Sequence, residues 1–174
     1  DMDNAIEYYK DRKKKDKVIA IYKDKIYFTP HITSNYNDYA AYLKDIEKYS
    51  EANEILKTSL QINPYQSNVY EQLGDIAKLE GDISKALDYY QKALLIQQEL
   101  GDRIETAKLL DNIAIIYHQQ GQTANDNAMR ISKFHSALEN YSKALGIFSG
   151  NEDNELTALI YNNIGNTYWE LNDF

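Results

Sequence analysis

The sequence predicts an all-α fold built from repeated helical hairpins, and three observations predict it. The stretch "YEQLGDIAKLEGDI" at Tyr70–Ile83 returns near the end of the chain as "YNNIGNTYWELNDF" at Tyr161–Phe174, with tyrosine, glycine and aspartate in matching places. Ala, Leu, Lys, Glu and Gln recur at helical spacing, while strand-forming runs are scarce. The 174 residues, of which 43% are hydrophobic, are enough to bury the core of one domain or one array.

The composition excludes several functional classes. The formal net charge of −8 has the wrong sign for a nucleic-acid binder, so we interpret the one dense basic run, Lys10–Lys17, as a solvated helix end. The absence of cysteine excludes disulfides and thiolate chemistry. No apolar run approaches the roughly 20 residues of a membrane span. We expect a cytoplasmic protein, and a signal or anchor removed from before Asp1 stays open as the alternative.

The clearest repeating unit runs from Ser67 to about Gln98, and its two helices each carry one apolar stripe. The stripes contain Tyr70, Leu73, Gly74 and Ala77 on the first helix and Ala86, Tyr90, Ala93 and Ile96 on the second. The small residues let the two backbones approach closely, and the large ones fill the spaces between them. Gly81 and Asp82 lie between the stripes as the turn that ends one helix and caps the next.

This pattern resembles the tetratricopeptide repeat, a unit of about 34 residues that folds as two antiparallel helices. The large, small and Ala-aromatic-Ala positions of that family are present, and Ala77 is a small departure. The resemblance implies a solenoid that winds as a right-handed superhelix. The longer link "QQELGDRIETA" is similar to the 40-residue-type repeats of kinesin light chain and related bacterial arrays, in which extra turns lengthen the second helix before Gly101 ends it.

The same register divides the chain into five parts. They are residues 1–32, the end of a preceding repeat plus an irregular connector; 33–66, one unit; 67–106, one unit with an extended second helix; 107–157, one unit with an insertion; and 158–174, the first helix of a truncated unit. Because "DMDNAIEYYK" matches "DISKALDYYQ", we expect the chain to enter near the start of a second helix and to be a slice of a longer solenoid. Residues 17–32 fit no repeat well, and both a short hairpin and a helix followed by a turn at Pro30 stay open.

The third unit carries eleven extra residues, because Gly81 and Ala86 are five apart whereas Gly121 and Ala137 are sixteen apart. The inserted text at 122–136 offers Asn125, Asp126 and Asn127 as caps and keeps a helical period of apolar residues from Met129. We expect the second helix to start early and to extend roughly three turns beyond its neighbours. Its end around Met129 to Phe134 is either a partner surface or part of a longer helix packed on its own array.

The sequence shows no constellation that carries bond chemistry, so we predict neither catalysis nor a bound cofactor or metal. The three histidines, His31, His118 and His135, are far apart and begin no metal-binding spacing. The acidic stretch 150–155 lacks the alternating ligands of a calcium loop, and we interpret it as a link between repeats. Most of the sixteen tyrosines fall on apolar stripes, where they serve as core wedges.

The resemblance implies that the first helices line a concave, peptide-binding face. The positions that point into it are Asn68, Glu71, Gln72, Asp75, Lys78 and Leu79 in the second unit, Lys108, Asp111, Asn112, Ile115, His118 and Gln119 in the third, and Leu159, Asn162, Asn163, Asn166, Trp169 and Glu170 in the last. The peptide-binding set that we predict leaves out Asn68, Leu79, Leu159, Trp169 and Glu170. The carboxylate clamp of some relatives is absent, since its places hold Glu71, Asp75, Leu159 and Asn163.

Asn112 and Asn163 recur at one repeat position, with Gln72 before them, and a side-chain amide satisfies both needs of a peptide backbone. Glu71, Asp75 and Asp111 favour a neutral or basic ligand. We therefore predict a non-catalytic scaffold that binds a peptide or helical segment of a partner protein. One alternative is a regulatory or sensor array whose effector domain lies outside this sequence, and another is an oligomer that assembles through exposed repeat ends.

Overall fold

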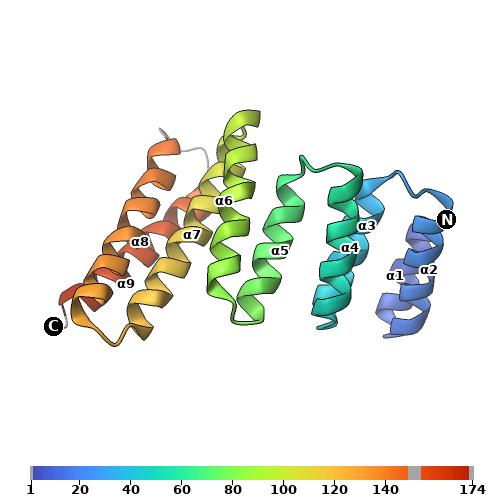
Figure 1. The fold of residues 1–174 in the computed structure, drawn as a ribbon, viewed down its shortest axis with the longest axis horizontal. Helices are drawn as coiled ribbons and strands as arrows, with labels where there is room; N and C mark the ends of the chain where they lie inside the picture. Colours follow the sequence, from blue (N-terminus) through green and yellow to red (C-terminus); the bar gives the residue numbers. More distant parts are fainter. Residues whose placement is uncertain (1, 149–153, 173–174) are drawn as a thin grey trace. The chain divides into compact units, whose positions relative to one another are not determined.

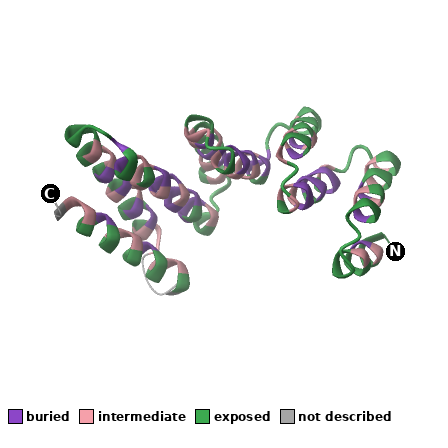
Figure 2. Cartoon of the chain, turned by 90° about the horizontal axis from the view of Figure 1, so that it is seen from below, coloured by how far each residue is buried: buried purple, intermediate pink, exposed green. Residues whose placement is uncertain are grey.

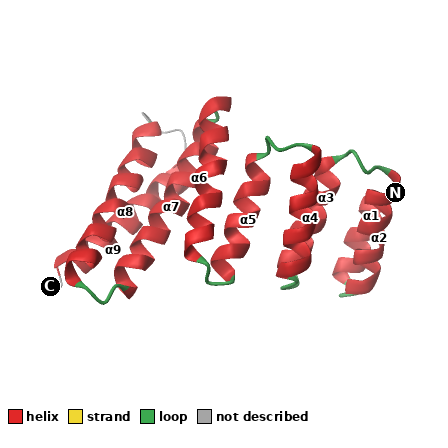
Figure 3. Cartoon of the chain, viewed as in Figure 1, coloured by secondary structure: helices red, strands yellow, loops and turns green. Residues whose placement is uncertain are grey.

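The chain is helical throughout the ranges that the structure, a computed structural model, describes: residues 2–148 and 154–172 (Figure 1). The helices in these ranges are α1 (Met2–Asp11), α2 (Lys15–Phe28), α3 (Thr33–Asp45), α4 (Tyr49–Ile62), α5 (Ser67–Leu79), α6 (Ile83–Leu100), α7 (Arg103–Thr123), α8 (Asn127–Ile147) and α9 (Asn154–Asn172). No β-strand occurs in the described ranges, which confirms the predicted all-α class (Figure 3).

The described chain divides into two compact units. The first extends to Ile76 and the second begins at Ala77, so the border lies inside α5. In the first unit α1 packs against α2, α2 against α3 and α3 against α4. In the second unit α6 packs against α7, and α7, α8 and α9 pack against one another.

Three helices of the chain begin at intervals of 34 residues. Lys15, which begins α2, is 34 positions before Tyr49, which begins α4, and Tyr49 is 34 positions before Ile83, which begins α6. Helix α2 therefore takes the place of a second helix, and α1 takes that of the first helix before it. The expectation that Asp1–Lys10 begins a second helix is wrong for this reason.

The expected irregular segment at residues 17–32 is also corrected. Helix α2 covers most of it, to Phe28, and the chain turns at Pro30, so the helix alternative holds and the hairpin does not. A signal for this was available, since Pro30 stands 34 positions before Pro64. The other boundaries proposed for the units remain an interpretation.

The first unit has an aromatic core and a buried polar network. Tyr22 and Tyr39 stack with their ring centroids 5.3 Å apart. At the family position where alanine is usual, Ser59 is fully buried and donates a hydrogen bond to Asn37 Oδ1 at 2.8 Å. Asn37 Nδ2 donates to Gln66 Oε1 at 3.1 Å, and Gln66 Nε2 donates back to the Ser59 carbonyl at 3.1 Å. Ser59 therefore satisfies polar atoms of two other buried side chains.

The core of the second unit is built from α7, α8 and α9. Its buried members are mostly small or aromatic and come from the apolar stripes of the repeat: Ala107, Leu110, Ala114, Ala137, Tyr141, Ala144 and Ile160 (Figure 2). Alanines on facing helices allow close approach, and Tyr141, 1% exposed, fills the space between them.

The inserted residues of the third unit lengthen two helices. Asn127, which begins α8, lies ten residues before Ala137, whereas Ile83 lies three before Ala86, so α8 gains seven residues. The other four lengthen the end of α7, which continues to Thr123. The early start of the second helix is confirmed, with Asp126 Oδ2 accepting from the Met129 amide at 2.7 Å as its cap. The extension is about two turns rather than three, because α7 absorbs the remainder.

The extended ends of α7 and α8 pack on each other. Gly121, the counterpart of the turn residue Gly81 in the repeat register, lies inside α7, and a Cβ atom built on it would stand only 2.6 Å from the Phe134 ring. Phe134 is fully buried, so this part of the insertion packs on its own array, while Met129 and Ile131 are exposed. The turn glycines are Gly81 and Gly101, whose φ angles of 81° and 74° favour glycine.

Candidate functional site

Three side-chain hydrogen bonds join α7 and α9, the helices that the repeat register interprets as first helices of consecutive units. Asn163 Nδ2 donates to Asp111 Oδ1 at 3.2 Å. His118 Nδ1 lies 2.9 Å from Thr167 Oγ1. Gln122 Nε2 donates to Glu170 Oε1 at 2.7 Å. These contacts recur along both helices at spacings of three to seven residues, so they fix α9 on α7 over about three turns.

The first contact holds a buried carboxyl group. Asp111 is 5% exposed, and this burial raises its pKa above the ordinary value, although the hydrogen bond from Asn163 acts in the opposite direction. The charge of Asp111 also adds to the effect of burial in raising the pKa of Tyr141. Asp111 therefore belongs to the packed interior, and a ligand on the surface does not meet it directly.

The second contact involves the imidazole ring of His118. Thr167 Oγ1 donates to the Asn163 carbonyl at 2.8 Å, so its lone pair is free to accept a hydrogen bond from an N–H at His118 Nδ1. Burial lowers the pKa of His118, and the nearby Glu170 partly opposes this. This environment favours the neutral imidazole with its proton on Nδ1, and the His118 ring also lies 5.4 Å from that of Phe134.

The surface of α9 that continues this face is exposed and rich in amides. Asn162 and Asn166 are exposed one turn apart, and Trp169 follows with 64% of its surface accessible. On α7, Gln119 is exposed and Asn112 and Ile115 are half-buried. This arrangement can offer hydrogen-bond donors and acceptors together with one large aromatic surface.

The predicted residues of α5 are engaged within the fold. In the first unit Glu71, Gln72 and Asp75 are half-buried. Asp75 Oδ2 forms an ion pair with Lys44 Nζ at 2.8 Å. Lys78 lies in the second unit, with its Nζ 6.0 Å from the centre of the Tyr90 ring. Asp75 thus already has a cationic partner, contrary to the role in attracting a basic ligand that we expected of it.

The three amides that we predicted to bind a peptide backbone, those of Gln72, Asn112 and Asn163, do not act together in the structure. Asn163 Nδ2 donates its hydrogen bond to Asp111, so this amide holds α9 against α7. Gln72 belongs to the first unit, and Asn112 to the second. Lys108 is exposed and pairs with Glu105 at 2.6 Å, one turn before it on the same helix. The residues brought together on one face are those of α7 and α9.

Two residues that join α7 and α9 were missed from the sequence. Gln122 was assigned to the insertion, whereas it lies on the last turn of α7, four residues after His118. Thr167 is fully buried on α9, between Asn163 and Glu170 in sequence. Extending the helical period of α7 past Gly121 would have placed Gln122 on the same face as His118.

Three further expectations concern chemistry outside this face. His31 and His135 are exposed side chains. Among residues 2–148 and 154–172, no three histidine or acidic side chains are grouped so that they could hold a metal ion. Residues 150–153 of the acidic stretch lie outside the described ranges. Within those ranges no helix combines the length and the apolar character that crossing a membrane requires.

Comparison with known proteins identifies the repeat. Residues 65–125 match the family model of the tetratricopeptide repeat. This range holds α5, α6 and α7, including the unit from which the pattern was deduced.

Several curated relatives are photosystem I assembly proteins called Ycf3. The chain is 35% identical over 100 residues to that of Prochlorococcus marinus subsp. pastoris, covering 58% of this chain and 46% of the relative. It is 32% identical over 115 residues to that of Cyanophora paradoxa, covering 64% and 60%. It is also 32% identical over 114 residues to that of Sorghum bicolor, covering 63% and 60%. The matches thus span about half the length of these relatives. The paired helices and the 34-residue spacing of α2 and α4 agree with this match of residues 65–125 to the tetratricopeptide repeat family.

Proposed function

We propose that this protein is a non-catalytic, cytoplasmic scaffold that binds an extended or helical segment of a partner protein along the face formed by α7 and α9. The observation that carries the proposal is the cross-helix hydrogen bonding that fixes these two helices while Asn162, Asn166 and Trp169 stay exposed. Because the face is already ordered, less conformational entropy is lost when a partner binds to it.

The chemistry of the face favours a neutral segment. The nearest carboxylates are occupied, since Asp111 is buried with Asn163 and Glu170 accepts from Gln122. Exposed amides can pair with both the N–H and the C=O groups of a peptide backbone. The Trp169 indole, next to them, can cover an apolar side chain of the same segment.

The relatives support a role in holding another protein. Those described above are assembly proteins for photosystem I, and such a task requires recognition of a protein surface. For this chain, assembly work on a protein complex is part of our proposal, and the identity of its partner is not implied by the likeness.

Tryptophan fluorescence gives a direct test, because Trp169 is the only tryptophan in the sequence and lies on the proposed face. Proteins captured from a lysate would be identified and their segments synthesised as peptides. A peptide that uses this face should shift the Trp169 emission to shorter wavelength in a saturable way. Asn162→Ala/Asn166→Ala should weaken binding by about tenfold, as expected for about two neutral hydrogen bonds.

The matched control is Asn4→Ala/Asn125→Ala, which removes two exposed amides from elsewhere in the chain. Equal weakening by both double variants would contradict the proposal. A captured peptide that binds tightly without changing the Trp169 emission would place the site elsewhere on the molecule.

A further inference from the structure

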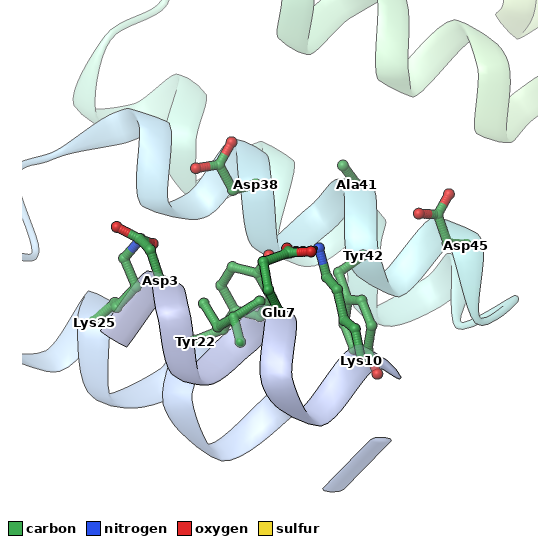
Figure 4. Close-up of a pocket in the computed structure, with 10 residues that line it drawn as sticks. Asp3, Glu7, Lys10, Tyr22, Lys25, Asp38, Ala41, Tyr42 and Asp45 are labelled. Carbon is green, nitrogen blue, oxygen red and sulfur yellow. Dashed lines mark hydrogen bonds and ion pairs between the residues drawn. The ribbon is translucent and has the colours of Figure 1, made fainter. Parts of the chain in front are cut away.

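A pocket in the first unit lies between α1, α2 and α3 (Figure 4). Its volume is about 330 Å³, within the range of pockets that hold small ligands or single side chains. Ile6, Tyr22 and Tyr42 supply its buried apolar part, being 3%, 5% and 8% exposed. All the residues that line it lie between Asp3 and Asp45, so the pocket is complete within this unit.

One wall carries charges that neutralise each other. Glu7 Oε1 lies 3.0 Å from Lys10 Nζ on α1. Asp3 Oδ1 lies 2.7 Å from Lys25 Nζ, which joins α1 to α2. Both lysines that line the pocket therefore have acidic partners on the same side of it (Figure 4).

The other wall carries two carboxylates of α3. Asp38 and Asp45 are exposed, and neither makes an ion pair with any residue in the described ranges. Ala41 lies between them on the same helix face and also lines the pocket (Figure 4). The pocket lining thus holds four carboxylates and two lysines, a net negative charge.

Tyr22 adds an unused hydroxyl group to this pocket. Its ring is buried against Tyr39 and against Tyr42, whose centroid is 5.7 Å away. Within the described part of the chain the Tyr22 hydroxyl makes no hydrogen bond, although the side chain is 95% buried and lines the pocket. Burial raises the pKa of Tyr22, so this hydroxyl is neutral and available as an acceptor.

We propose that this pocket binds the guanidinium group of an arginine side chain from a partner protein, between Asp38, Asp45 and the Tyr22 hydroxyl. The planar, five-donor guanidinium can pair with a carboxylate and a hydroxyl at once, and it stacks on aromatic rings. The face of Tyr42 already attracts a cation, because Lys10 Nζ lies 5.9 Å from its centroid. Charge complementarity therefore selects a basic occupant.

This inference goes beyond the function proposed above. It uses none of the residues of the α7–α9 face, and it names a basic side chain where that face suits a neutral segment. Its test can fail while the other succeeds, since the two sites share no residue.

The experiment titrates the whole chain with the peptide acetyl-Gly-Arg-Gly-amide and follows backbone amide shifts by NMR. We expect saturable shifts at Asp38, Ala41 and Tyr42. The neutral isostere with citrulline in place of arginine should bind at least tenfold more weakly, since a hydrogen bond to a charged group is lost. Asp38→Asn/Asp45→Asn should weaken binding of the arginine peptide by a similar factor, and Tyr22→Phe should weaken it less. The NMR spectra of these variants should otherwise match that of the unsubstituted protein.

The matched control is Asp16→Asn/Asp24→Asn, which removes the same charge from exposed positions of α2 outside the pocket. If this control weakens binding as much as the pocket variant, the attraction is a general charge effect and the proposal is wrong. Equal binding of the citrulline peptide, or no saturable shift at all, would also overturn it. A lysine peptide that binds more tightly than the arginine peptide would refute the assignment to arginine.

Discussion

Replacing Gly121 by alanine tests the close packing of α7 on α8. An added Cβ atom would lie 2.6 Å and 2.7 Å from two atoms of the Phe134 ring, about 0.8 Å short of the 3.4 Å at which ordinary contact begins. The ring is fully buried, so it can move only by disturbing its neighbours, among them His118. Overpacking of this kind costs about 1–3 kcal/mol.

The same substitution also has a favourable effect, because alanine is better than glycine inside a helix by about 1 kcal/mol. Gly165→Ala in α9 isolates that effect, since a Cβ atom there would meet nothing within 4 Å. We expect Gly165→Ala to raise the free energy of unfolding by about 1 kcal/mol. Gly121→Ala should leave it unchanged or lower it by up to about 2 kcal/mol.

Urea unfolding followed by Trp169 fluorescence measures both variants, because the only tryptophan lies in the same unit as both glycines. The difference between the free energies of unfolding of the two variants gives the cost of overpacking at Gly121. Phe134→Leu should reduce it when combined with Gly121→Ala, which a double-mutant cycle would reveal as a favourable coupling. Equal stabilisation by the two alanine substitutions would refute the packing described here.

Three further predictions concern buried polar groups. Ser59→Ala should lower the free energy of unfolding by about 1–3 kcal/mol in a urea titration, because Asn37 loses a buried donor, whereas Thr58→Ala on the exposed side should have little effect. Asp111→Asn should raise the free energy of unfolding at pH 7. The reason is that a carboxyl group whose folded pKa is raised stabilises the fold when it is protonated. It loses that contribution as the pH rises through its folded pKa. The gain should therefore shrink as the pH falls towards 4, and a constant gain would contradict the shift. In an NMR titration the ring signals of His118 should titrate below pH 6.5. Glu170→Gln should lower the pKa of His118 further, because it removes the charge that opposes the effect of burial. An unchanged His118 titration in this variant would show that Glu170 exerts no such influence.

The helical class and the central unit were predictable, since they depend on local patterns. Tyr70 and Gly74 on α5, like Ala86 and Tyr90 on α6, are four residues apart and follow the helical period. The first hairpin was missed because Ile6 and Val18 occupy places where the pattern expects small residues, so only the spacing of Pro30 and Pro64 remained as a signal.

The candidate face was only partly predictable for a different reason. The repeat register places Asp111, His118 and Asn163 on first helices, but it does not say which side chains bond to one another across helices. Whether Asn163 faces a ligand or Asp111 depends on the distance between α7 and α9, and that distance is set by the packing of the core between the helices. The role of Gly121 likewise depends on where the Phe134 ring lies.

The network of Asn37, Ser59 and Gln66 has a consequence for how this unit can change over time. Each of the three side chains satisfies the other two in a buried place, so losing any one leaves orphaned polar atoms behind. Substituting all three together by apolar residues removes that cost, whereas each single step passes through a less stable intermediate. The trio should therefore be inherited or replaced as a block, and a design that restores the family's alanine at position 59 alone would weaken the unit.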